Sequence, residues 1–201
     1  MSRFFRVLIA IVLSVSILPG VIGAQTNKDG KPAYAFKTVR EIKHTPVKDQ
    51  YRTGTCWCFA TVSFLEAELL RLGKGEFDLS EMFVVRHTYP KKVLNYVQLH
   101  GNAVHQQGGQ SHDVIDRLRE SGIVPEGVYN GLNIGEKRHN HGEMVAVLQG
   151  VADAVLKREG GRLTPRWLEA YEAVLDHLER LDYEEQQLNS ATLIEVLSWA
   201  E

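Results

Sequence analysis

Residues 46–60 read PVKDQYRTGTCWCFA and hold both cysteines of the chain, Cys56 and Cys58. After Cys56, apolar residues recur at steps of three or four positions from Phe59 to Leu72, which predicts a helix starting at Cys56. Gly54 allows the chain to turn tightly just before that helix. The stretch therefore predicts a loop that passes into a helix, with a cysteine at the junction.

Four interpretations of the two cysteines compete. A metal pair or a redox pair usually has C-x-x-C spacing, whereas these cysteines are two positions apart. In a helix such side chains point about 200° apart, so a disulfide between them would unwind the helix. Two packing cysteines are the simplest alternative, because cysteine is often fully buried.

The fourth interpretation is a nucleophile at Cys56. A helix N-terminus carries partial positive charge and unpaired N–H groups, which stabilise a thiolate, the attacking species. Gln50 is a candidate oxyanion donor together with the Cys56 backbone N–H; the alternative is an exposed loop glutamine. Trp57 is a candidate wall of the site, and we interpret Cys58 as a small core residue.

Length and composition exclude some classes of function. The chain has 201 residues, enough for one domain with an extension. Its hydrophobic content of 44% and charged content of 24% are typical of a soluble globular protein. A formal net charge of −2 gives no basic surface for nucleic acid, so we expect no nucleic-acid partner.

The first 24 residues differ from the rest of the chain. Arg3 and Arg6 precede an uncharged run, VLIAIVLSVSILPGVIGA, which ends in small residues. This pattern predicts a secretory signal cut near Ala24. The alternative is a membrane anchor, which the short run and Pro19 disfavour. We therefore expect an exported protein, periplasmic or extracellular, without stable membrane insertion after cleavage.

Four more helices are expected beyond the first. Ser80 is the predicted cap of the second helix, which Pro90 kinks or divides. Ser111 is the predicted cap of a short third helix. Two amphipathic helices are expected over residues 143–161 and 165–181.

Three blocks carry a family resemblance: TPVKDQYRTGTCWCFA at 45–60, DLSEMFVVRHTY at 78–89 and QQGGQSHDVIDRLRESGIVPEGVY at 106–129. In order and spacing they resemble the active-site segment, the Leu-Ser-Glu helix and the Gly-Gly loop of papain-like cysteine peptidases. The resemblance implies an α+β fold of which this chain carries the left, mainly helical lobe. It also implies peptide substrates that bond to the backbone of Gly108 and Gly109, and no cofactor or metal.

Further details resemble one branch of that family. Thr53 and Gln106 occupy the positions that a disulfide joins in the usual papain pattern, and both halves are missing together. This loss, and LSEMFVVRHTY itself, are more like the bleomycin hydrolase and aminopeptidase C branch, whose members are cysteine aminopeptidases with a helical insertion. We therefore divide the chain into a signal peptide (1–24), a nucleophile lobe (25–135) and a helical extension (136–201).

The family also needs a histidine to pair with the thiol and an asparagine to orient it, both on a strand-rich second lobe. We expect that lobe to be absent here. His105 lies near the Gly-Gly loop but not at the family's base position, and His139 and His141 form HNH in a polar loop. We interpret the other histidines as structural or exposed, so the sequence offers no good general base. This favours a truncated gene product or a fragment of a longer chain.

The main hypothesis is a cysteine peptidase, aminopeptidase-like in action. One alternative is a truncated or inactive peptidase that keeps its peptide groove as a binding or interaction protein. Another is a small exported helical protein whose cysteines merely pack. A lobe without its partner would expose apolar surface, which leaves a homo-oligomer open.

Overall fold

The computed structural model describes residues 37–132, 135–158, 160 and 162–179. The chain divides into two units, Met1–Glu41 and Ile42–Glu201. In the first unit, residues 37–41 are described, and they are exposed. The predicted signal peptide and the end of the predicted helical extension lie outside the described residues.

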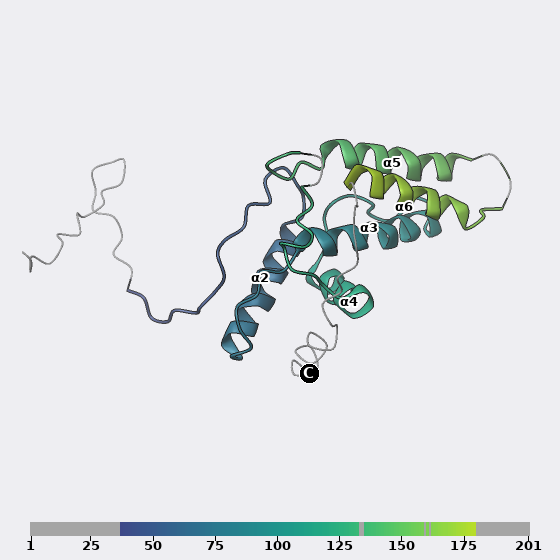
Figure 1. The fold of residues 1–201 in the computed structure, drawn as a ribbon. Coiled ribbons are helices and arrows are strands. Elements are labelled where there is room, and N and C mark those ends of the chain that lie inside the picture. Colours follow the sequence, from purple (N-terminus) through teal and green to yellow (C-terminus); the bar gives the residue numbers. More distant parts are fainter. Residues whose placement is uncertain (1–36, 133–134, 159, 161, 180–201) are drawn as a thin grey trace, which may run out of the picture. The chain divides into compact units, whose positions relative to one another are not determined.

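The described part of the second unit is helical. Its helices are α2 (Cys56–Arg71), α3 (Glu81–Gln98), α4 (Ser111–Ser121), α5 (Gly142–Lys157) and α6 (Arg166–Glu179) (Figure 1). Within the described ranges the extended segments form isolated bridges, Arg52 with Asn140 and Leu79 with Pro125, and no sheet. The expected helical lobe with a helical extension is therefore confirmed, and the described residues hold no strand-rich lobe.

Helix α3 lies at the centre of this unit, in contact with each of the other four described helices. It begins where predicted, because the Ser80 hydroxyl accepts the Phe83 N–H at 3.0 Å and caps the first turn. It then continues through Pro90 as one helix, which excludes one of the two predicted alternatives, a new segment starting at the proline. Tyr89 and Val93, on either side of the proline, are almost fully buried, and their packing offsets the helix bond that proline removes.

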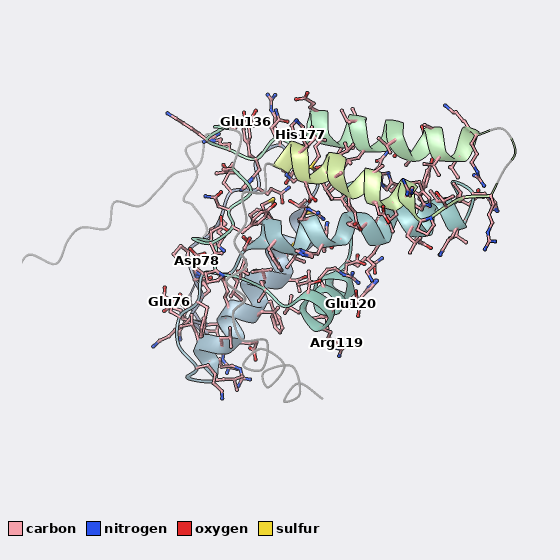
Figure 2. All side chains as sticks on the ribbon, turned by 45° about the vertical axis from the view of Figure 1, so that its right-hand side comes forward. Glu76, Asp78, Arg119, Glu120, Glu136 and His177 are labelled. Carbon is pink, nitrogen blue, oxygen red and sulfur yellow. The ribbon has the colours of Figure 1, made fainter. Side chains whose placement is uncertain are left out.

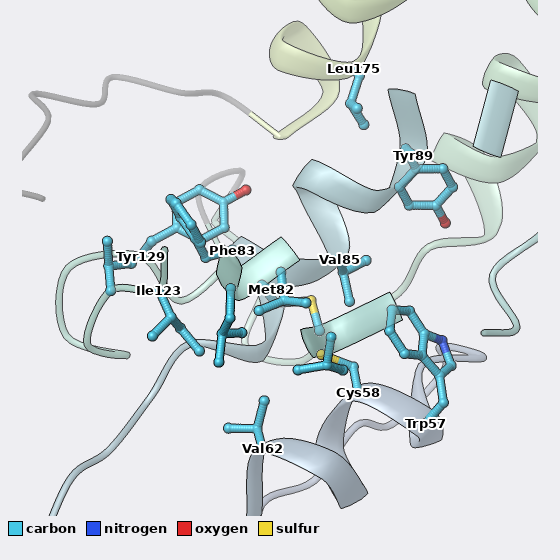
Figure 3. Close-up of a cluster of buried hydrophobic side chains, with 14 of the residues drawn as sticks. Trp57, Cys58, Val62, Met82, Phe83, Val85, Tyr89, Ile123, Tyr129 and Leu175 are labelled. Carbon is cyan, nitrogen blue, oxygen red and sulfur yellow. The ribbon is translucent and has the colours of Figure 1, made fainter. Parts of the chain in front are cut away.

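Helix α2 has one buried and one exposed face. Val62, Leu65 and Leu69 are buried, as the spacing predicts, whereas Phe64 on the opposite face is 62% exposed. Figure 3 shows Cys58 and Val62 of α2 close to Met82 and Val85 of α3 in the shared core. The inner face of α2 therefore fixes its position on α3 and leaves Cys56, its first residue, at the surface.

Helices α5 and α6 lie side by side, and both pack on α3 (Figure 1). Their inner positions are fully buried: Leu148, Ala152, Tyr171 and Leu175. No helix in the described part of the chain combines the length and apolarity needed to cross a membrane. The pair forms a second layer that packs on α3 side chains not covered by α2 and α4.

The start of α4 differs from the prediction. Ser111 is the first helical residue and Gln110 is the N-cap, with the Gln110 backbone N–H donating to the Asp113 carboxylate at 2.8 Å. The predicted Ser111 cap is wrong. The helix begins one residue earlier than predicted, because the Asp113 carboxylate accepts the backbone N–H of Gln110 and so makes Gln110 the N-cap. Helix α4 is therefore capped by the residue that directly follows the Gly-Gly pair.

Candidate active site

The two cysteines occupy opposite environments. Cys56 is the first residue of α2, is exposed and forms no disulfide. Cys58 has no exposed surface, and its Sγ donates to the Glu81 carbonyl at 3.4 Å. Burial raises the pKa of the Cys58 thiol well above its ordinary value, and the negative charge of Glu81 adds to the effect. A thiol in that state is a poor nucleophile, so Cys56 is the reactive candidate.

The loop before Cys56 is held by its own side chains. The Thr53 hydroxyl donates to the Gln50 carbonyl at 3.1 Å, and the Thr53 and Thr55 hydroxyls lie 2.5 Å apart. Tyr51 adopts a left-handed conformation with φ 47°, which is uncommon for a residue other than glycine. The chain bends at Gly54, as predicted, and Tyr51 adds a left-handed residue three positions earlier in the same loop.

Gln50 lies in this loop, six residues before Cys56. Its Nε2 donates to the Thr53 carbonyl at 2.8 Å. A side-chain amide nitrogen carries two N–H groups, so this bond takes up one of them. The predicted oxyanion role of Gln50 stays a prediction, and the Thr53 bond gives the amide a fixed orientation.

Gln107 joins the cysteine loop to the Gly-Gly loop. Its Oε1 accepts the Gly54 N–H at 2.6 Å, and its backbone carbonyl accepts the Trp57 indole N–H at 2.9 Å. A Cβ on Gly54 would lie 2.9 Å from the Gln107 Cβ, so glycine is needed here for close approach. Gln107 thus holds the residues on both sides of Cys56, a role that the sequence did not reveal.

The two glycines of the Gly-Gly pair have different surroundings. A Cβ on Gly109 would lie 2.6 Å from the Trp57 ring, whereas one on Gly108 would meet nothing within 4 Å. Gly109 therefore packs against the indole, and Gly108 borders open space. Trp57 itself is 9% exposed and supports the loop, and its predicted place in the wall of the site stays a prediction. The substrate contacts expected of the pair stay predictions.

Lys92 supports the same loop from α3. Its ammonium donates to the Gln106 carbonyl at 2.7 Å and also to the Gly108 carbonyl. Its Nζ lies 5.8 Å from the centre of the Trp57 ring. Burial lowers the pKa of Lys92, and the charge of Asp113 opposes that effect. No sequence pattern marks Lys92, because its contact depends on how α3 passes the loop.

A cluster of charges lies beneath α2. The Lys48 ammonium is within 3.3 Å of both Glu66 and Glu81, whose side chains are almost fully buried. Glu66 also accepts the Thr45 hydroxyl at 2.5 Å and the Leu79 N–H at 2.7 Å. Burial opposes the charge on Lys48, but its acidic neighbours outweigh burial and raise its pKa. The cluster fixes the start of the quoted stretch to α2 and α3.

A cavity of about 620 Å³ adjoins this cluster. Asp49, next to Gln50, borders it, and so does Phe59, one turn after Cys56. Glu126 also lines it; burial raises the pKa of that carboxyl to about 7, and Glu81 adds to the shift. Glu76 and Asp78, on the segment between α2 and α3, lie at the same end of the unit (Figure 2). The lining therefore combines several carboxylates with Lys48, Lys137 and Arg138 and with aromatic rings.

The histidines lie in different environments, and the contacts found for them are not to Cys56. His87 bonds to the Phe83 carbonyl at 2.8 Å, and His177 is exposed on α6 (Figure 2). His105 is 3% exposed, so it does not line a cleft. None of the side-chain contacts found for the eight histidines is to Cys56, in agreement with the absence of a recognisable base in the sequence.

The HNH segment differs from expectation. A polar loop predicts exposed side chains, but His139 and His141 are buried, at 9% and 8% exposure. Burial lowers the pKa of both, that of His141 to about 4 with the neighbouring His139 adding to the effect. The reason is a parallel bridge: the Arg52 N–H donates to the His139 carbonyl at 3.1 Å and draws the segment against the cysteine loop.

An exposed cysteine at the start of a core helix, beside a glycine loop tied to it, defines a thiol-enzyme type of site. Comparison with known families agrees with it. The model of the papain family cysteine proteases matches residues 35–143, more than half of the chain. The chain therefore belongs to the papain family of cysteine proteases.

Individual relatives give a narrower comparison. The chain is 28% identical over 115 residues to "Cysteine proteinase 1, mitochondrial" of Saccharomyces cerevisiae strains YJM789 and ATCC 204508 / S288c. The alignment covers 48% of this chain and 24% of each relative, so the chain spans about a quarter of the length of these curated relatives. The match is consistent with the bleomycin hydrolase and aminopeptidase C branch.

Proposed function

We propose that the protein acts on peptides through the thiolate of Cys56, in an aminopeptidase-like manner. The observation that carries the proposal is the contrast between an exposed Cys56 at the start of α2 and a fully buried Cys58. Family membership supports the same chemistry. The Gln107 bonds, which tie the Gly-Gly loop to Gly54 and Trp57, support peptide binding next to the thiol.

The proposed reaction proceeds through an acyl-enzyme. The Cys56 Sγ attacks the peptide carbonyl carbon, and the oxygen of the tetrahedral intermediate is stabilised by the Cys56 backbone N–H and the Gln50 amide. The C–N bond then breaks, and the amine leaves with a proton taken from solvent, which receives a proton back when the thiol ionises again. Water hydrolyses the thioester and regenerates the thiol. In this account the Thr53 bond orients the Gln50 amide before substrate arrives.

The proton transfers need a base, and this requirement favours a second candidate function. None of the contacts found for the imidazoles is to Cys56, so we infer slow turnover by this arrangement alone. The second candidate is a peptide-binding protein that keeps the groove without efficient hydrolysis. Both candidates predict a reactive Cys56 and differ in turnover.

The test compares the natural protein with a Cys56→Ala variant. Aminoacyl and dipeptidyl fluorogenic substrates with free or acetylated N-termini report hydrolysis, and fluorescent peptides report binding. Turnover that Cys56→Ala abolishes, with preference for free N-termini, supports the aminopeptidase. Peptide binding by both proteins without turnover supports the binding protein. Turnover that survives in Cys56→Ala contradicts the proposal.

Export is a separate proposal. It rests on the basic start, the uncharged run and the small residues at the predicted cut near Ala24. Expression with a C-terminal tag in a bacterial host, followed by fractionation and N-terminal sequencing, tests it. A processed chain beginning at Gln25 outside the cytoplasm is expected, and an unprocessed cytoplasmic chain contradicts it.

A further inference from the structure

His105 is a buried histidine at the start of the segment that carries the Gly-Gly pair. Its ring lies between two tyrosines, with ring centres 5.5 Å from Tyr96 and 5.6 Å from Tyr171. Its Nε2 is 2.8 Å from the Tyr171 hydroxyl, and its Nδ1 is 3.2 Å from Gln149 Oε1. The side chain thus joins the loop before α4 to α5 and α6, the two helices of the extension.

The neighbours of Gln149 determine which nitrogen of His105 carries the proton. The Gln149 Nε2 donates to the Asp153 carboxylate at 2.9 Å, and the Tyr96 hydroxyl donates to the same oxygen at 2.9 Å. A carboxylate only accepts, so the Gln149 amide nitrogen faces Asp153 and its oxygen faces His105. The imidazole therefore donates from Nδ1 and accepts the Tyr171 hydroxyl at Nε2.

The residues after His105 are tied to the site at almost every position. Lys92 binds the carbonyls of Gln106 and Gly108, and Gln107 binds Gly54 and Trp57. These contacts run from the loop toward α2 and α3. His105 anchors the same loop on its other side, toward α5 and α6.

We propose that His105, held between Gln149 of α5 and Tyr171 of α6, is a positioning residue that fixes the peptide-binding loop beside Cys56. The inference rests on the proposed function, because it concerns the loop expected to bind the peptide backbone. It gives the helical extension a role in the site: α5 and α6 set the position of a loop that they do not themselves form. Burial lowers the pKa of His105, which agrees with the neutral ring that this bonding pattern requires.

The test uses the natural chain and three variants. His105→Phe removes both hydrogen bonds and keeps an aromatic ring, and Tyr171→Phe removes the hydroxyl donor alone. Val174→Ala trims a partly buried α6 side chain that packs against the core, and serves as the control for a general loss of packing. Two quantities are measured: hydrogen exchange of the backbone N–H groups of residues 103–110, and inactivation of Cys56 by a peptidyl epoxide, resolved into KI and kinact.

The expected result is a selective effect on the loop. His105→Phe raises exchange in residues 103–110 and raises KI about tenfold, while kinact stays within about twofold. Tyr171→Phe has a smaller effect in the same direction, and Val174→Ala leaves loop exchange and KI unchanged. Unchanged loop exchange in both His105→Phe and Tyr171→Phe overturns the inference, as does an equal effect of Val174→Ala.

The readouts separate this inference from the proposed function. If the epoxide fails to label Cys56 in the natural chain, the proposed function fails, and the exchange data still decide whether His105 orders the loop. If Cys56 is labelled and His105→Phe changes neither exchange nor KI, the positioning role fails alone. If His105→Phe does not fold, Tyr171→Phe and its exchange data decide.

Discussion

The outer and inner sides of α2 differ in exposure and in bonding. On the outer side, Cys56 is exposed and is preceded by a loop that Gln107 holds in place. On the inner side, Cys58 is fully buried and Glu66, two turns further along, bonds to Lys48. One short stretch of helix therefore supplies both a reactive group and an anchor for the core. Substitutions on the outer side should change reactivity, and those on the inner side should change stability.

The largest effect is expected at the inner anchor. Glu66→Ala removes one of the acidic partners of Lys48 and the acceptor of the Thr45 hydroxyl and of the Leu79 N–H. Breaking a buried pair on one side costs about 3–5 kcal/mol, enough to unfold a marginal domain. Urea unfolding followed by circular dichroism measures the loss. The control is Glu68→Ala on the same helix, which breaks a surface pair with Arg71 and should leave the midpoint unchanged.

The Gly-Gly pair separates packing from substrate contact. Gly109→Ala forces a Cβ to within 2.6 Å of the Trp57 ring and should cost about 1–3 kcal/mol by overpacking. Gly108→Ala meets no atom within 4 Å, so it should leave the unfolding midpoint unchanged. In the proposed function it should still weaken peptide binding, since the Cβ enters the space next to the loop. Equal unfolding curves for the two variants would contradict the packing of Gly109 on Trp57.

The two cysteines provide the most direct internal comparison of stability. Cys58→Ala empties a fully buried site and removes the donor to the Glu81 carbonyl, at a cost of about 1–2 kcal/mol. Cys56→Ala changes an exposed side chain and should alter stability by less than about 0.5 kcal/mol. Parallel thermal melts of the two variants test the contrast. A larger loss in Cys56→Ala would reverse the assignment of inner and outer sides.

The smallest effect is expected at Glu126, and it depends on pH. Burial raises the pKa of Glu126 from 4.5 to about 7 in the folded protein, so between these values the native state binds more protons than the unfolded state. The stability that this group contributes is therefore complete below pH 4.5 and is lost as the pH rises through 7. Glu126→Gln does not titrate and should match the natural protein at pH 5.

At pH 8 the same variant should be more stable than the natural protein, because it lacks the partly buried charge that Glu126 carries there. Solvent screens this carboxyl, so the expected gain is only about 1 kcal/mol. Unfolding midpoints at the two pH values measure the difference. A gain at pH 5 that disappears at pH 8 would show the opposite sign of linkage.

The sequence predicted those parts of the molecule that local signals determine. The spacing of Val62, Leu65 and Leu69 located α2, and the Ser80 cap located α3, because both depend on residues within one or two turns. The exposed Cys56 and buried Cys58 followed from the same helix. These local signals were sufficient to place the candidate nucleophile.

Contacts between distant segments could not be predicted in this way. Gln107 lies about fifty positions from Gly54 and Trp57 along the chain, and no local pattern marks such a pair. His139 and His141 read as residues of a polar loop, but the bridge to Arg52 buries them. Pro90 predicted either a kink or a new segment, and α3 continues through it because residues on both sides are packed in the core. In each case a tertiary contact decided the outcome.

The central claim is that Cys56, and not Cys58, is the nucleophile. Treatment of the natural protein with a peptidyl epoxide, followed by proteolysis and mass spectrometry, measures which thiol is modified. We expect selective modification of Cys56, no modification of Cys58, and complete loss of labelling in Cys56→Ala. Labelling of neither thiol, or of both to the same extent, would contradict it.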